Sequence, residues 1–340
     1  MKLKISRYCL IIISLLFSLI FYSCDTSQAP TEPSTITMPA FTDNIPYSAL
    51  GSGKIAFERI GPQDNAYLGL VIIDLNKATV NTYNGTYLYP CLSPNGDKIA
   101  FSGPSYVTYS FDICVMNIDG TGLDDISGTL ADDRFPAWSP DQQKIFFYYS
   151  PLYTTGIQDL VVQSPSSAAQ NQQLLQHFNY AVGPISISSQ KIVYNAFFSP
   201  SGIYTTNLDG SSPSLILAAP ANRNLESPCF SPDGNSIAYL SVDRDTTGLY
   251  HSVEVKIMNT DGTSPKSIVT VPAGGSLEWD NPDQVDDVSV CWSPDGRKLL
   301  FVVHENDLES HVYVVNADGT GLTKVTTLAG ITDRKVSWSK

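Results

Sequence analysis

The chain has 340 residues, which is enough for one large domain or two small ones. Its formal net charge is −13, with 20 Lys and Arg against 33 Asp and Glu. This balance argues against a nucleic-acid partner, whose affinity depends on basic contacts to phosphate, and against a basic surface that binds anionic lipid.

The N-terminal 23 residues are typical of an export signal and are not expected to join the fold. A basic segment, residues 2–7, precedes an apolar run, residues 9–22, which is too short to span a bilayer comfortably. A small residue and a cysteine then follow at Ser23 and Cys24, which resembles the bacterial lipobox, although Phe21 stands where that pattern usually has Leu. We predict lipidation at Cys24; the alternatives are an ordinary cleaved signal and an uncleaved anchor.

Residues 24–50 are predicted to form a tether. They contain four prolines among Ser, Thr and Ala, a composition that cannot build a core. Several acyl chains on one cysteine would give stable anchoring, whereas a single chain gives only marginal binding. The ordered domain is therefore expected over residues 51–340, tethered at the bacterial cell envelope, either at the outer membrane or facing the periplasm.

From residue 53 onward the sequence repeats itself. A bulky apolar residue followed by serine recurs at spacings of 43 to 62 residues, which fit four short strands with their turns. The six copies are Leu92-Ser93, Trp138-Ser139, Ile187-Ser188, Phe230-Ser231, Trp292-Ser293 and Trp338-Ser339.

Each repeat continues with the same turns and strands. A Pro-Asp-Gly or Pro-Asn-Gly turn follows the serine in three copies, and it is degraded at 140–142 and lost at 188–190. An apolar strand comes next, as at 98–101, and a third strand ends in Asn-x-Asp-Gly, as at 117–120. These apolar runs suit sheets packed on both faces.

This pattern resembles the TolB-like, WD40-like repeat. The resemblance covers roughly residues 53–340 and implies an all-β fold, a six-bladed β-propeller of four-stranded antiparallel blades. The first ordered segment, residues 54–57, matches the second strand of a blade, and the last, residues 336–340, matches an innermost strand. We therefore predict that the C-terminal strand completes the N-terminal blade, leaving no sheet edge there.

Four cysteines remain after the signal and Cys24, namely Cys91, Cys114, Cys229 and Cys291. Their predicted positions lie on strands that are not neighbours or on adjacent blades, about 10 Å apart. A disulfide needs Cα atoms within about 7 Å. All four are predicted to be free thiols that behave as small buried hydrophobes.

No catalytic motif stands out, and neither a metal nor another cofactor is predicted. Histidines and carboxylates do fall together near the loops of the last two repeats: His251, His304, His311, Asp243, Asp245, Glu305 and Asp307. Such a group could hold a metal, as in some propeller lyases. The interpretation we favour is that these are solvated loop residues.

Three carboxylates recur six residues before the aligned serine, at Asp133, Asp287 and Asp333. In a propeller this position is the entry of the innermost strand, near the mouth of the central channel. A partial acidic ring there could hold Ca²⁺, which takes oxygen ligands. We favour strand-entry turns in which Asp accepts hydrogen bonds from backbone donors.

The loops opposite the Ser-Pro-Asp-Gly turns vary in length and carry most of the aromatic residues. Tyr and Trp are common interface anchors, and variable loops on a rigid scaffold often carry function. The predicted partner-binding residues are Tyr106, Tyr109, Tyr149, Tyr153, Phe197, Phe198, Tyr250 and Trp279. The alternative is that these rings pack between blades.

The family resemblance implies a non-catalytic scaffold that binds protein partners at the cell envelope. Fold alone does not fix function, so an enzyme or glycan-binding propeller that uses loop residues remains the alternative. The sequence leaves the enzyme question open, and the lack of a catalytic motif favours a non-enzymatic role.

Overall fold

The structure is a computed structural model, and it describes residues 43–61, 67–105, 110–129, 131–151, 158–166, 172–178, 182–197, 199–244, 250–274, 288–306 and 309–340. Over these ranges the regular elements are strands, apart from one short helix, α1 (Tyr47–Leu50). Within the same ranges, no helix has the length and apolar character needed to cross a membrane.

Four sheets of the described chain each contain four antiparallel strands that pair in sequence order. Their alternating and continuous apolar stretches are buried between neighbouring sheets, as the sequence pattern predicts. The strands are β4 (Leu88–Leu92), β5 (Lys98–Pro104), β6 (Phe111–Asn117) and β7 (Asp124–Asp125); β8 (Ala131–Trp138), β9 (Ile145–Pro151), β10 (Gln158–Gln163) and β11 (Gln173–Phe178); β12 (Val182–Ile187), β13 (Lys191–Ala196), β14 (Gly202–Asn207) and β15 (Ser214–Ala218); and β16 (Arg223–Phe230), β17 (Ser236–Arg244), β18 (Tyr250–Asn259) and β19 (Lys266–Pro272).

The fifth sheet joins the two ends of the ordered chain. Its strands are β1 (Lys54–Ile60), β2 (Tyr67–Asp74), β3 (Thr79–Tyr83), β20 (Val290–Trp292), β21 (Lys298–Asn306), β22 (Glu309–Asn316), β23 (Thr323–Lys324) and β24 (Thr332–Ser339). As predicted, the C-terminal strand β24 pairs antiparallel with β1. A single parallel bridge, between Ser310 and Thr332, connects β22 to β24.

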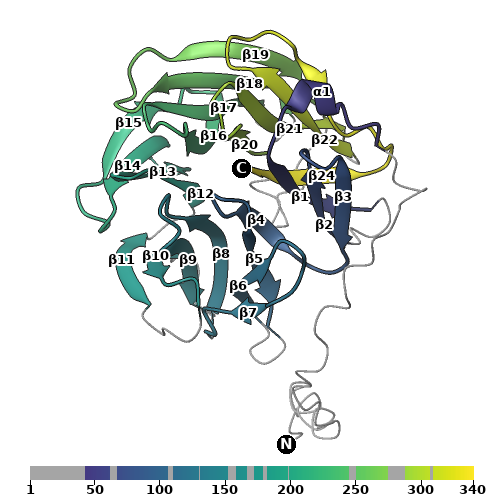
Figure 1. Cartoon of the computed structure of the whole chain (residues 1–340). Coiled ribbons are helices and arrows are strands. Elements are labelled where there is room, and N and C mark those ends of the chain that lie inside the picture. Colours follow the sequence, from purple (N-terminus) through teal and green to yellow (C-terminus); the bar gives the residue numbers. More distant parts are fainter. Residues whose placement is uncertain are drawn as a thin grey trace, which may run out of the picture.

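That bridge is where the structure differs from the predicted set of six separate four-stranded sheets. It merges β20 to β23 with β24, β1, β2 and β3 into one eight-stranded sheet, so the described strands form five sheets. The five sheets stand around a common centre, at which the C-terminus lies (Figure 1). The fold is an all-β propeller.

The strands nearest the centre contain a recurring irregularity that the sequence did not indicate. Tyr89, Phe135, Ser227 and Lys335 each lie four residues before an aligned serine and have positive φ, between 48° and 57°. The strand pairing shifts register beside each of them. Such left-handed non-glycine residues cost roughly 1–3 kcal/mol each and persist only where the surroundings hold them.

The Ser-Pro-Asp-Gly turns are held by their own side chains. Ser93 Oγ donates to Asn95 Oδ1 at 2.8 Å and accepts from the backbone N–H of Lys98 at 3.0 Å. Gly96 in this turn has φ of 72°, and a Cβ there would lie 2.2 Å from the carbonyl oxygen of Lys340. The serine and Asn or Asp contacts, together with a φ of about 70° at Gly96, Gly234 and Gly296, explain why these residues recur together, whereas the close approach to Lys340 occurs at Gly96.

Candidate functional site

A cavity of about 950 Å³ lies at the centre of the sheets. It extends along the inner strands from the left-handed residues to the Ser-Pro-Asp-Gly turns and the C-terminal Lys340. One ring of its lining comes from the position two residues before each aligned serine, where the side chains are small: Cys91, Ala137, Ser186, Cys229, Cys291 and Ser337.

The walls of this central cavity are tied together across sheets. Trp138 Nε1 donates to the backbone carbonyl of Cys91 at 3.0 Å, and Trp292 Nε1 donates to that of Cys229 at 3.3 Å. At one end, Lys335 Nζ lies 5.3 Å from the ring centroid of Tyr89, a cation–π arrangement. These contacts between sheets give the cavity a fixed shape.

The four cysteines are less buried than predicted. All four described cysteines are free, as predicted, but they are half-buried, and three of them line the central cavity. Burial raises the pKa of Cys91 to about 11 and that of Cys229 to about 12, and it raises the pKa of Cys291 as well. Since the thiolate is the nucleophile, a raised pKa lowers the fraction of reactive thiolate at neutral pH.

Most of the predicted aromatic partner-binding residues cannot be placed. Tyr106, Tyr109, Tyr153, Phe198 and Trp279 lie outside the described residues, as does the side chain of Tyr250. Tyr149, at the end of β9, and Phe197, just after β13, are half-buried. Tyr149 packs against the core between two sheets, as the alternative interpretation expected.

Two of the three predicted channel-mouth carboxylates are fully buried, and neither lines the central cavity. Asp333 forms a two-pronged ion pair with Arg59, at 2.6 Å to Nε and 2.9 Å to Nη2. Asp133 accepts a hydrogen bond from Thr129 Oγ1 at 3.0 Å. Asp287 lies outside the described residues.

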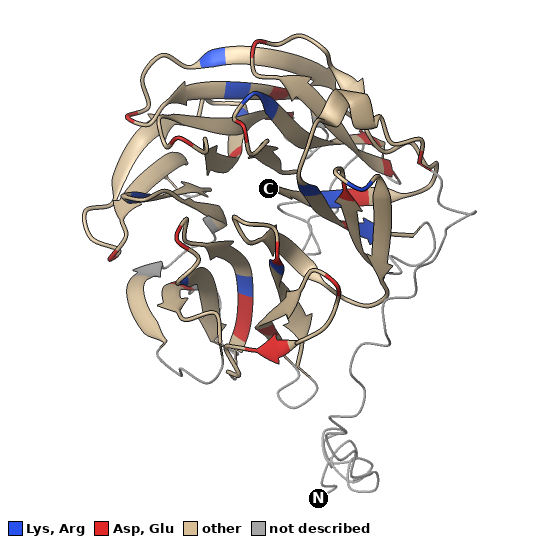
Figure 2. Ribbon diagram, in the orientation of Figure 1, with Lys and Arg blue, Asp and Glu red and all other residues tan. Residues whose placement is uncertain are grey.

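Asp133 lies in an acidic region. Figure 2 shows β7, which is Asp124–Asp125, in red and acidic and basic residues adjacent along β8. Burial raises the pKa of Asp133 to about 8, with Asp112 and Asp125 adding repulsion, while hydrogen bonds to Ser127 and Thr129 oppose the shift. Burial and the charge of Asp112 also raise the pKa of Asp125 to about 6.

We expect Asp133→Asn to change how stability depends on pH. The folded-state pKa of Asp133 lies above its ordinary 3.8, so the native state holds a proton that the unfolded chain releases. Below about pH 4 the carboxyl is protonated in both states, and this contribution to stability is at its full value. As pH rises through about 8, the unfolded chain has released the proton and the contribution is lost. Asn stays neutral at every pH. The free energy of unfolding of the variant, measured in urea, should therefore rise relative to that of the parent by a few kcal/mol between pH 5 and pH 9. Asp132→Asn, whose side chain is 30% exposed, is the control, and equal pH profiles for parent and Asp133→Asn would contradict the expectation.

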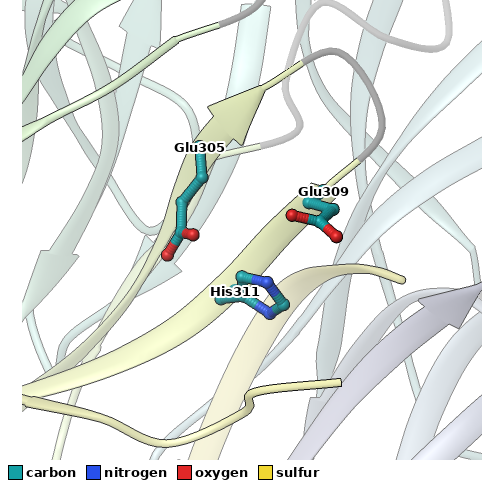
Figure 3. A group of neighbouring side chains, drawn as sticks. All are labelled: Glu305, Glu309 and His311. Atoms are coloured by element: carbon teal, nitrogen blue, oxygen red, sulfur yellow. The ribbon is translucent and has the colours of Figure 1, made fainter. Parts of the chain in front are cut away.

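The histidines that the sequence placed near the loops of the last two repeats lie on strands. His304 lies in β21 and His311 lies in β22, and both are buried. His251 lies in β18 and is exposed. The structure brings His311 together with Glu305 and with Glu309, a residue that the sequence analysis missed (Figure 3). Its spacing from His311, two apart on one strand, is the signal that could have found it. Asp245 and Asp307 lie outside the described residues.

No protein-family model matches the chain, and no curated protein sequence matches it. Solved structures do. TolB from Acinetobacter baumannii superposes with a TM-score of 0.65 at 17% identity, covering 84% of this chain and 66% of that one. A putative TolB from Agrobacterium tumefaciens gives 0.55 at 15% identity, covering 85% of this chain and all of that one.

The fold is that of a TolB-like β-propeller. The resemblance drawn from the repeat is therefore confirmed. An oligogalacturonate lyase in complex with manganese shares the fold as well, with a TM-score of 0.53 at 14% identity, covering 84% of this chain and 77% of that one. Proteins with different activities thus share the TolB-like β-propeller architecture, and function has to be argued from this chain's own residues.

Proposed function

We propose that this TolB-like β-propeller is a non-catalytic protein-binding scaffold anchored at the bacterial cell envelope through a lipid on Cys24. The support for the anchor is the N-terminal sequence, in which a basic segment and a short apolar run precede Ser23 and Cys24. Cys24 itself lies outside the described residues.

We also propose that the ring has six blades. Four are the separate four-stranded sheets, and the other two are the halves of the eight-stranded sheet on either side of the single bridge between Ser310 and Thr332. The half made of β24, β1, β2 and β3 has the same strand order as the separate sheets, with the strand of the aligned serine first.

The central cavity is the observation that supports binding of a partner. Its volume of about 950 Å³ lies at the upper end of the range for ligand sites, roughly 300–1,000 Å³. Small side chains, hydroxyls and proline rings line it together with large aromatic side chains such as Trp138 and Trp292, and hydrogen bonds between sheets hold its walls. A protein segment with small or apolar side chains fits such a lining better than a highly charged ligand does.

The turns at one end of the cavity carry ionised carboxylates next to Lys340, and Lys335 lies at the cavity as well. Asp233 belongs to a rim turn, and the hydroxyl of Ser231 lowers the pKa of its carboxyl, so it is ionised at neutral pH. Together with the net charge of −13, this favours a partner whose contacting segment is neutral or basic.

The alternative surface is the aromatic face predicted from the sequence, at the other ends of the strands. Of its residues, the structure describes the side chains of Tyr149 and Phe197, and both are half-buried. This face is the second location that the same partner could use, and photo-crosslinking distinguishes it from the central cavity.

Site-directed photo-crosslinking in intact cells tests the proposal. A photoreactive amino acid is placed at Ser189 on the cavity rim, at Phe197 on the aromatic face, and at Ser214 on the outer strand β15 as a control. We expect one discrete protein adduct from Ser189 and none from Ser214. Ser189→Trp should then reduce binding of that adduct protein at least tenfold, while Ser214→Trp leaves it unchanged. Adducts only from Phe197 would move the site to the aromatic face, and no protein adduct from either position would contradict the scaffold.

The second candidate function is an enzyme or glycan-binding propeller. The observation that favours it is the group formed by Glu305, Glu309 and His311, because carboxylates and imidazole are the side chains that most often transfer protons in catalysis. Turnover of envelope or plant glycans that is lost in Glu309→Gln would support this function in place of the scaffold.

A further inference from the structure

Three side chains from one hairpin converge outside the central cavity. Glu305 lies near the end of β21, and Glu309 and His311 lie on β22 (Figure 3). One ligand atom from each lies within 4.8 Å of the others. Residues two apart on a strand share a face, which places Glu309 beside His311. Val303 pairs with His311 across the hairpin, and Glu305 follows Val303 by two, so Glu305 lies on the same face.

The imidazole of His311 has an unsatisfied nitrogen. The residue is 2% exposed, and its Nδ1 has no hydrogen-bond partner among the described residues. A buried polar atom without a partner is costly, and in native proteins it usually has a bound water, ion or ligand. His311, which carries this unpartnered nitrogen, belongs to the group that also contains two carboxylates (Figure 3).

Neighbouring groups fix the orientation of both carboxylates. Asn306 Nδ2 donates to Glu309 Oε2 at 2.9 Å, and the Gly330 N–H donates to Glu309 Oε1 at 2.5 Å. The hydroxyl of Tyr313 donates to Glu305. Outer contacts of this kind orient ligands in metal sites and tune their affinity.

Lys324 is the competing cation at this group. Its Nζ lies 2.7 Å from Glu305 Oε1, and its side chain is 31% exposed on a flexible stem. An incoming metal ion would therefore have to displace this ammonium group or share the carboxylate with it. Removing the ammonium should strengthen metal binding, which is the opposite of what the loss of a ligand would do.

We propose that Glu305, Glu309 and His311 bind a divalent transition-metal ion, of the class of Zn²⁺ or Mn²⁺. Carboxylates alone would suit Ca²⁺ or Mg²⁺, whereas a buried imidazole nitrogen favours a transition metal. The proposal concerns residues away from the central cavity and does not depend on the scaffold function.

Calorimetric titration of chelator-treated, tag-free protein with Zn²⁺, Mn²⁺ and Ca²⁺ tests the site. We expect one equivalent of Zn²⁺ or Mn²⁺ to bind more tightly than Ca²⁺. His311→Gln should weaken that binding at least tenfold, and Glu309→Gln should do the same if the first variant does not fold. Lys324→Gln should tighten binding several-fold. His251→Gln, a change at an exposed histidine, is the matched control and should bind as the parent does.

Three outcomes would overturn the metal site: no Zn²⁺ or Mn²⁺ binding at millimolar concentration, equal binding by the parent and the folded His311→Gln and Glu309→Gln variants, or weaker binding in Lys324→Gln. Crosslinking from Ser189 that is unchanged by chelator would show that the scaffold function stands whatever the metal result. Loss of the crosslink together with intact metal binding would leave the metal site standing without the scaffold.

Discussion

Deletion of residues 331–340 is expected to unfold the whole domain. The deletion removes β24, which pairs along β1 from Lys54 to Ile60 and separates β1 from β22. It takes Ile331, Val336 and Trp338 out of the protein interior, where each is at most 8% exposed. Burial of one such side chain is worth about 1.5–3 kcal/mol, so three of them approach the whole stability of a typical domain.

The same strand also ties sheets that are far apart in the sequence. Ser337 Oγ accepts a hydrogen bond from the Leu92 N–H, and Trp338 Nε1 donates to the Ser52 carbonyl at 3.1 Å. Thermal unfolding followed by circular dichroism measures the effect, with deletion of Lys340 alone as the control, because that exposed residue follows β24. A truncated protein that melts within a few degrees of the parent would show that β24 does not hold the domain together.

The regular part of the fold could be predicted from the sequence because it is local and repeated. The apolar stretch at residues 98–101 lies in β5, and the turn at Ser93 is held by contacts within five residues. The pairing of β24 with β1 is not local, yet the sequence predicted it. The first ordered segment matches the second strand of a blade, and the last segment matches the innermost strand that this blade lacks. The repeated copies of one pattern supplied the redundancy that single strands do not have.

The irregular part could not be predicted from residue type. A proline follows three of its four residues, at 90, 136 and 228, but the residue before a proline usually takes an extended conformation, so this recurrence does not indicate a positive φ. Tyr89, Phe135, Ser227 and Lys335 share a backbone conformation but no side-chain property. The single bridge that merges two sets of strands into one sheet depends on how closely Ser310 and Thr332 approach, which is a property of packing.

The candidate sites were only partly visible in the sequence. Glu305 and His311 were singled out, but their partner Glu309 was not, because the interpretation placed these residues in loops, where a spacing of two carries no meaning. The predicted propeller implied a central channel, but Asp133 and Asp333, which the sequence placed near its mouth, do not line the cavity. Its lining comes from small residues such as Ser186 on six separate strands, which join only when the sheets surround one centre.

The segment predicted as a tether shows how a long-range contact escapes sequence analysis. Its last residues are part of the ordered structure, with Leu50 only 1% exposed at the end of α1. Asp43 Oδ1 accepts hydrogen bonds from the Thr327 and Leu328 N–H groups at 2.7 and 2.9 Å. Asp43 Oδ2 lies 2.6 Å from Arg59 Nη2, which joins this segment to the ion pair between Arg59 and Asp333.

Arg59→Met is expected to destabilise the protein by about 3–5 kcal/mol, the cost of leaving buried charges without their partner. Burial alone would lower the pKa of Arg59, but Asp333 and Asp43 outweigh it and raise the pKa, so the guanidinium is charged throughout the accessible pH range. With Met at this position the carboxylate of Asp333, 0% exposed, loses both of its bonds to Arg59. The measurement is the free energy of unfolding in urea.

A second substitution separates the charge from the packing of the side chain. Asp333→Asn in the Arg59→Met background removes the stranded charge, so the double variant should be more stable than the sum of the two single changes predicts, by at least about 1 kcal/mol. Lys77→Met is the control, since Lys77 is 74% exposed and pairs with Asp74 at 3.3 Å near the surface, where an ion pair is worth about 0–1 kcal/mol. If Arg59→Met costs no more than Lys77→Met, or if the two buried changes simply add, then the ion pair does not stabilise the junction of β1 and β24. In that case the apolar contacts of Ile331, Val336 and Trp338 would have to account for the effect of deleting the strand.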